Sequence, residues 1–140
     1  MPDVRFPVEV VRGVPVVAAP AEIDITNAAG LRAALAEAAA YGHQTSVVDM
    51  TRTQFCDSSG LHALLDAHRR ARAEGGEVLL AISAAAVLRV LALTGLDRVL
   101  PNFTSLDEAL ATADAGADAG IGSLHVALDP SAVPAPLAEL

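Results

Sequence analysis

Short apolar segments alternate with alanine-rich segments of helical periodicity along most of this chain. Residues 45–50 and 77–82 are apolar runs with the length and composition of buried strands. Residues 28–41 and 61–74 instead repeat leucine and alanine at helical spacing. Such alternation predicts an α/β fold in which helices cover a mostly parallel sheet.

The first two predicted strands make the sheet mixed. Residues 6–11 and 14–19 are rich in valine, and Arg12 and Gly13 between them supply a turn. We therefore expect a leading β-hairpin, in which Pro15 lies at a strand start or at a sheet edge.

Helix-capping residues mark the remaining elements. Asn27 is an N-cap type before the first predicted helix, and Ser83 is expected to cap the third. The run Ser105-Leu106-Asp107-Glu108 has the form of a capping box and predicts a last helix that continues to about Ala113. Together these signals predict a mixed sheet of four to five strands with about four helices.

We expect a single domain over residues 1–113. The chain has 140 residues, and its core must be built from valine, leucine, isoleucine and alanine because only 3% of its residues are aromatic. Residues 114–140 are rich in alanine, glycine and proline, which predicts a flexible C-terminal tail.

Charge and cysteine content exclude several function classes. A formal net charge of −8 makes nucleic acid and anionic membranes poor partners. Cys56 is the single cysteine, so the sequence contains no intrachain disulfide and no Cys-x-x-Cys pair. Residues 1–5 lack signal-peptide features, and no apolar run is long enough to cross a bilayer. We therefore expect a cytoplasmic protein with no metal and no cofactor.

The chemistry is concentrated in Asp57-Ser58-Ser59-Gly60, where a strand-to-loop segment enters a helix. Free backbone N–H groups and the positive end of the helix dipole lie at such a point, so a phosphate is tolerated there. In a protein interface that phosphate would add roughly −1.5 to −2 charges beside a carboxylate. A plainer interpretation is that these residues only cap the helix, because Asp and Ser are common N-caps.

The residues around this motif resemble the signature of STAS-domain anti-sigma factor antagonists. An apolar strand, Val47-Val48-Asp49-Met50, leads to Phe55-Cys56-Asp57-Ser58-Ser59-Gly60-Leu61 at the start of a helix. Further similar segments, in the family's order, are Glu22-Ile23-Asp24, Gly75-Gly76-Glu77 and Leu93-Thr94-Gly95-Leu96-Asp97. The resemblance covers residues from about 4 to 113.

The resemblance implies a partner-switching cycle. In that family the unphosphorylated protein binds an anti-sigma factor and so releases a sigma factor. The anti-sigma factor is a serine kinase with a histidine-kinase-like ATPase fold, and it phosphorylates the first serine of the motif, here Ser58. That phosphate abolishes binding until a PP2C-type phosphatase removes it. The residues expected at the partner-binding surface are Asp24, Asp57, Ser59, Gly60 and Leu61.

Other function classes fit the sequence less well. An enzyme is disfavoured because His43, His62, His68 and His125 lack metal or catalytic spacing, and we interpret them as surface or half-buried residues. A response-regulator receiver needs a late lysine, and the chain contains no lysine. A STAS scaffold or ligand-binding regulatory module of another signalling complex remains open, since its core motifs would look much the same.

Overall fold

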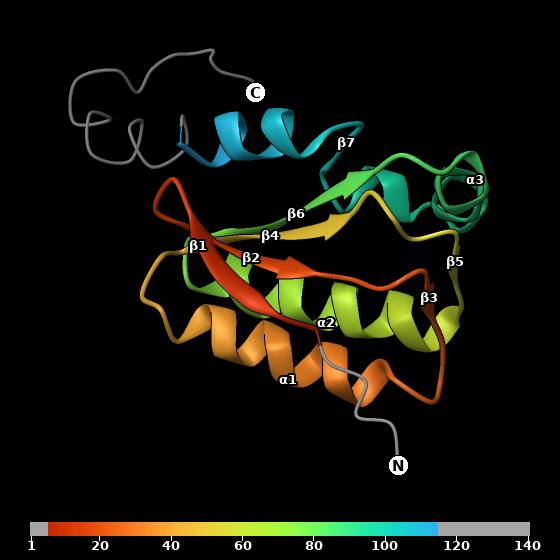
Figure 1. Cartoon of the computed structure of the whole chain (residues 1–140), viewed down its shortest axis with the longest axis horizontal. Helices are drawn as coiled ribbons and strands as arrows, with labels where there is room; N and C mark the ends of the chain where they lie inside the picture. Colours follow the sequence, from red (N-terminus) through yellow and green to blue (C-terminus); the bar gives the residue numbers. More distant parts are fainter. Residues whose placement is uncertain (1–5, 115–140) are drawn as a thin grey trace.

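A mixed sheet forms the centre of the protein in a computed structural model that describes residues 6–114 (Figure 1). Its five strands have the spatial order β1-β2-β4-β6-β7. β1 and β2 are antiparallel, and β4, β6 and β7 continue parallel to β2. The strands are β1 (Val8–Val11), β2 (Val14–Ala18), β4 (Thr45–Met50), β6 (Glu77–Ile82) and β7 (Asn102–Phe103). The predicted mixed sheet is confirmed.

The leading hairpin turns at Arg12 and Gly13, whose φ angles are 53° and 80°. Two central residues with positive φ match a type I′ turn, which suits the twist of a β-hairpin. Pro15 lies in β2 before the pairing with β4 begins at Val16. The proline therefore occupies the start of an interior strand, where it removes no hydrogen bond to β4.

Helices cover both faces of the sheet. α1 and α2 lie side by side against one face, and the last helix lies against the opposite face (Figure 1). The helices are α1 (Ala28–Ala39), α2 (Ser58–Ala73), α3 (Ala85–Thr94), the 3-10 turn η1 (Leu96–Arg98) and a helix over 106–114. The prediction of about four α-helices is confirmed. No helix within residues 6–114 has the length and apolarity that crossing a bilayer requires.

Neighbouring residues of β4 contribute to two different cores. Val48 packs with Leu31 and Leu64 in the core beneath α1 and α2. Val47 packs with Leu110 in the second core, beneath the last helix. Because both faces of the sheet are buried, consecutive residues of β4 and β6 are buried rather than alternating with exposed ones.

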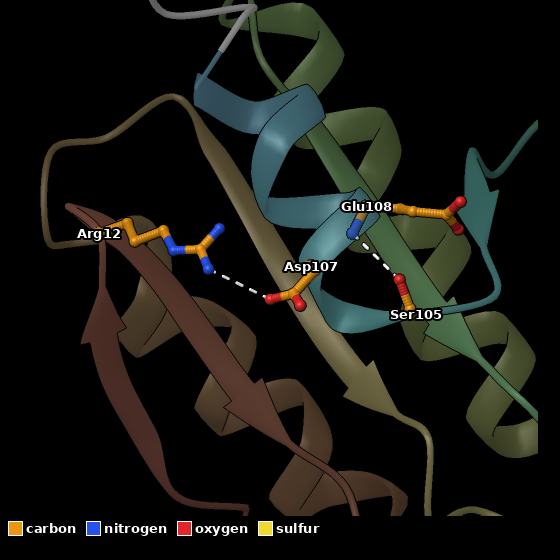
Figure 2. Close-up of polar contacts among 4 residues, drawn as sticks. All are labelled: Arg12, Ser105, Asp107 and Glu108. Atoms are coloured by element: carbon orange, nitrogen blue, oxygen red, sulfur yellow. Dashed lines mark hydrogen bonds and ion pairs between the residues drawn. The ribbon is translucent and has the colours of Figure 1, made fainter.

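The last helix begins with the predicted capping residues, although the Glu108 carboxylate accepts from the Thr104 N–H rather than from the Ser105 N–H. The Glu108 N–H donates to Ser105 Oγ at 3.1 Å (Figure 2). The bond from the Thr104 N–H to the Glu108 carboxylate is 3.3 Å long. The Arg12 guanidinium reaches Asp107 Oδ1 at 3.2 Å, which links the helix to the hairpin turn.

Ser83 does not cap α3, because the N-cap position belongs to Ala84 and the Ser83 hydroxyl donates to the Thr104 carbonyl at 3.3 Å. The predicted flexible tail, 114–140, falls outside the described residues except for residue 114, which lies in the last helix.

Candidate functional site

A second, two-stranded sheet brings the two predicted site loops together. β3 (Glu22–Ile23) and β5 (Phe55–Cys56) are parallel, and they lie where α1 and α2 begin (Figure 1). Beyond this pairing, the Asp57 N–H donates to the Ile23 carbonyl at 3.0 Å. Asp24 and Asp57 therefore follow directly after paired strands, at one edge of the molecule. The sequence analysis missed both strands, because two residues are too few to show periodicity.

Asp57 is the N-cap of α2. Its Oδ1 accepts from the Ser59 N–H at 2.9 Å and from the Gly60 N–H at 3.3 Å. These bonds satisfy two of the N–H groups that a helix start leaves without an intrahelical partner. The capping role that the sequence suggested for the motif thus falls to the aspartate.

Ser58 is the first residue of α2, and its side chain is exposed. Among the described residues, nothing accepts from or donates to its hydroxyl, whereas Asp57 provides the cap. A pure capping role therefore explains Asp57 but leaves the Ser58 hydroxyl without a structural task. The adjacent Ser59 is half-buried.

Gly60 and Leu61 lie beneath the loop rather than on its surface. A Cβ on Gly60 would lie 2.6 Å from Ile23 Cγ2 and 2.7 Å from Cys56 Sγ, so only glycine allows this close approach. Leu61 is buried in the core under α1 and α2. Both residues fix the position of Ser58, and their direct contact with a partner stays a prediction.

Asn27 holds the Asp24 loop in place. Its Oδ1 accepts from the Asp24 N–H at 2.9 Å, and its Nδ2 donates to the Glu22 carbonyl at 2.8 Å. Asp24 Oδ1 in turn accepts from the Thr26 hydroxyl and from the Thr26 N–H, and these bonds lower the pKa of the Asp24 carboxyl. Asp24 is therefore a preorganised, half-exposed anion beside the Ser58 loop.

Two large apolar side chains are exposed on the same two loops. Ile25 is 75% exposed and Phe55 is 52% exposed. We call this pair the apolar rim, because Ile25 follows Asp24 and Phe55 lies on β5 shortly before Ser58. The sequence analysis missed the rim, although an isoleucine between an aspartate and a threonine in a polar loop was a usable signal.

The segment before β5 is tied by hydrogen bonds to the loop that contains Ala21. Thr53 is fully buried, and its hydroxyl donates to the Pro20 carbonyl at 2.8 Å. The Gln54 N–H donates to the Ala21 carbonyl at 2.7 Å. An alanine at position 21 is thus compatible with a fixed arrangement of both loops.

Cys56 offers no reactive thiol to this site. Its side chain is buried against Gly60, and desolvation, reinforced by the neighbouring Asp57 charge, raises the pKa of the thiol to about 12. A thiol of this kind stays protonated at neutral pH, so it is a poor nucleophile and metal ligand.

The histidines do not form a site within the described residues. His68 is 6% exposed, and its Nδ1 accepts from the Val78 N–H at 3.1 Å, so the expectation of a surface or half-buried residue was wrong for it. His43 is half-buried and His62 is exposed, whereas His125 lies outside the described residues. Residues 6–114 contain no group of three or more His, Cys, Asp or Glu that would suit a metal ion.

Comparison with known families identifies the fold. The family model of the STAS domain matches residues 5–109, which is most of the chain. The chain is a member of the STAS-domain family. No curated protein matches it in sequence.

Solved structures place this STAS protein beside anti-sigma factor antagonists. It is 32% identical to an anti-sigma factor antagonist from Mycobacterium paratuberculosis, with a TM-score of 0.70 over 76% of this chain and 91% of that one. It is 27% identical to the phosphorylated form of SpoIIAA, a cell fate determinant from Bacillus, with a TM-score of 0.58 over 76% and 97% of the two chains. A sulfate transporter family protein from Wolinella succinogenes shares the fold at 20% identity, with a TM-score of 0.59 over 79% and 92%.

Proposed function

We propose that this STAS protein is an anti-sigma factor antagonist that changes partners when Ser58 is phosphorylated. Its unphosphorylated form binds an anti-sigma factor serine kinase with a histidine-kinase-like ATPase fold and so releases a sigma factor. Phosphorylation of Ser58 abolishes this binding, and a PP2C-type phosphatase restores it. The protein acts in the cytoplasm as a binding module and catalyses no reaction itself.

The observation that carries this proposal is the exposed Ser58 hydroxyl at the first position of α2. Since Asp57 supplies the helix cap, adding a phosphate to Ser58 removes no bond that the fold uses. The positive end of the helix dipole lies at the same point and favours a negative charge there. Modification of Ser58 is therefore compatible with an unchanged fold.

The surroundings of Ser58 explain why a phosphate would prevent binding. Asp57 precedes it, the preorganised Asp24 lies on the neighbouring loop, and the apolar rim of Ile25 and Phe55 borders both loops. A partner that covers this surface must desolvate the new dianion beside two carboxylates. A penalty of about 4 kcal/mol lowers affinity about a thousandfold.

The proposal is tested with three baits in a lysate of the native cell, followed by mass spectrometry of the captured proteins. The baits are the wild type, Ser58→Glu and Thr112→Glu. Thr112→Glu is the control, because it adds the same charge on the last helix, which packs against the opposite face of the sheet. We expect the wild type and Thr112→Glu to capture an ATP-binding serine kinase and Ser58→Glu to lose it. The captured kinase is then purified to measure the Kd of each variant.

Two results would contradict the proposal. Capture of the same non-kinase proteins by all three baits would favour a STAS scaffold or a regulatory module of another signalling complex. Equal kinase affinity of the wild type and Ser58→Glu would show that charge at Ser58 does not control binding. Circular dichroism spectra of the three baits exclude unfolding as the cause of a loss.

A further inference from the structure

A solvent-open cavity of about 220 Å³ lies between the C-terminal halves of α1 and α2. This is the end of both helices that is remote from the candidate site, on the left in Figure 1. Arg70, which lines the cavity, is twelve residues after Ser58 along α2, or about 18 Å at the rise of an α-helix. The cavity is therefore separate from the proposed partner surface.

The sequence explains why space remains there. In the N-terminal halves of the two helices, leucines such as Leu31 and Leu64 fill the interface. In the C-terminal halves most of the facing residues are alanines, which have only a methyl group to contribute, although Leu35 of α1 also lines the cavity. The alanines that line the cavity are Ala36, Ala39, Ala67 and Ala71.

Ser46 is the buried polar group of this cavity. It lies on β4, on the same face as Val48 and Met50, and is 6% exposed. Its hydroxyl has no hydrogen-bond partner within residues 6–114, although it lines the cavity. Because a buried hydroxyl without a partner is costly, an atom of a molecule in the cavity is its natural partner.

The other polar side chains that line the cavity are His43, Gln44, Arg70 and Glu74, and His43 and Arg70 contribute donors. The His43 Nδ1 accepts from the Thr45 N–H at 3.0 Å, so the neutral ring carries its proton on Nε2 and donates from there. Arg70 adds a permanent positive charge at the rim. Glu74 is the one acidic side chain among the described residues that line the cavity, and it is exposed.

The negative ends of the two helix dipoles lie at this point. In the last turn of α2, Arg70 and Arg72 offset the dipole of that helix, because cations near a helix C-terminus interact favourably with it. Donor groups on apolar walls therefore favour a ligand with an anionic acceptor and an apolar body.

We infer that the cavity between α1 and α2 binds a small amphipathic monocarboxylate, such as a short-chain fatty acid. Its carboxylate accepts from Ser46, His43 and Arg70, and its apolar body contacts the alanines of both helices. A volume of 220 Å³ equals that of about seven water molecules, which suits a chain of about six carbon atoms. This site goes beyond the proposed partner switch and does not depend on it.

An NMR titration of the full chain tests this inference without any partner protein. Hexanoate is the probe, and hexanamide is its neutral counterpart of the same size. We expect saturable shifts of the amide signals around Ser46 and Arg70 with hexanoate, with a Kd of about 1 mM for a ligand of this size. Hexanamide should bind at least about fivefold more weakly, because it lacks the charge that Arg70 attracts.

Matched variants locate the site. We expect Arg70→Gln to weaken hexanoate binding about fivefold, whereas Arg69→Gln, the same change on the neighbouring residue outside the cavity, leaves it unchanged. Ser46→Ala should weaken binding too, and Ala71→Leu should block it by filling the cavity. Amide spectra without ligand verify that each variant is folded, so loss of binding is not confused with unfolding.

Several outcomes would overturn the inference. They are the absence of saturable shifts with hexanoate, equal binding of hexanamide, and equal weakening by Arg69→Gln and Arg70→Gln. Tighter binding of hexylamine than of hexanoate would show that Glu74, rather than Arg70, sets the charge preference. None of these outcomes bears on kinase binding, so failure of this inference is distinguishable from failure of the proposed function.

Discussion

Asp57 and Ser58 are adjacent in the chain but have different surroundings. The Asp57 carboxylate is engaged by the N–H groups of Ser59 and Gly60 and holds the start of α2. The Ser58 side chain is exposed, and it makes no hydrogen bond to any other described residue. The helix cap therefore belongs to Asp57, and the serine to which we assign the switch can change its charge without disturbing that cap.

Asn27→Ala should destabilise the protein by about 1–3 kcal/mol, because it removes two hydrogen bonds from a buried side chain and leaves their backbone partners unsatisfied. Urea denaturation measures the free energy of unfolding. Gln44→Ala is the matched control, since it removes an exposed amide whose bond to the Glu74 carbonyl is 3.3 Å long. It should cost less than about 0.5 kcal/mol. Equal losses in both variants would contradict the structural role of Asn27.

His68 should make stability fall as the pH drops below about 6.5. Burial, the largest cause, lowers the pKa of His68 in the folded protein. The unfolded chain therefore takes up the proton first, so the stability contribution is complete above the unfolded pKa of about 6.5. It is lost as the pH falls through the lower folded pKa.

His68→Gln should flatten this part of the pH profile, because glutamine stays neutral. The measurement is urea denaturation of both proteins at several pH values above about pH 5, where most carboxylates remain ionised. Asp66, whose pKa is lowered by the hydrogen bond from Arg32, titrates at more acidic pH and affects both proteins alike. Parallel profiles of the wild type and the variant would show that His68 does not cause the fall.

The long elements were predictable from sequence, and the short ones were not. The bounds of β4 and β6 match the predicted apolar runs, and Gly95 ends α3 with a φ of 78°. β3 and β5 escaped prediction because each has two residues, and their pairing depends on contacts between distant segments. The same two strands bring the Asp24 and Ser58 loops together, so the motif residues were predictable but their arrangement was not.

Ser83 shows a second limit of local reasoning. Serine is a good N-cap, yet its hydroxyl bonds to the Thr104 carbonyl, which lies 21 residues later. A tertiary partner has replaced the local one.

The last helix should owe its position to packing rather than to its ion pair. Leu110 is 1% exposed in the second core, so Leu110→Ala should destabilise the protein by about 2–5 kcal/mol. Arg12→Gln removes the ion pair with Asp107. The Arg12 and Asp107 side chains are 53% and 82% exposed, so this change should cost less than about 1 kcal/mol. Thermal or urea denaturation compares the two variants. A larger loss for Arg12→Gln would reverse this assignment.

At the scale of the whole molecule, the candidate site and the cavity lie on different parts of the protein. α1 and α2 begin at the candidate site and end at the cavity, so the two regions lie at opposite ends of one helix pair. Relatives with the same fold include anti-sigma factor antagonists and a transporter family protein. Because one fold serves several functions, the fold alone does not assign the switch, and Ser58 is the residue on which the proposal depends.

Mapping the phosphorylated residue tests the central claim most directly. The kinase that the wild-type chain captures is incubated with ATP and with the wild type, Ser58→Ala or Ser59→Ala, and the phosphate is located by mass spectrometry. We expect a single phosphate on Ser58 in the wild type and in Ser59→Ala, and none in Ser58→Ala. Phosphate transfer that persists in Ser58→Ala would contradict the assignment of Ser58 as the switch.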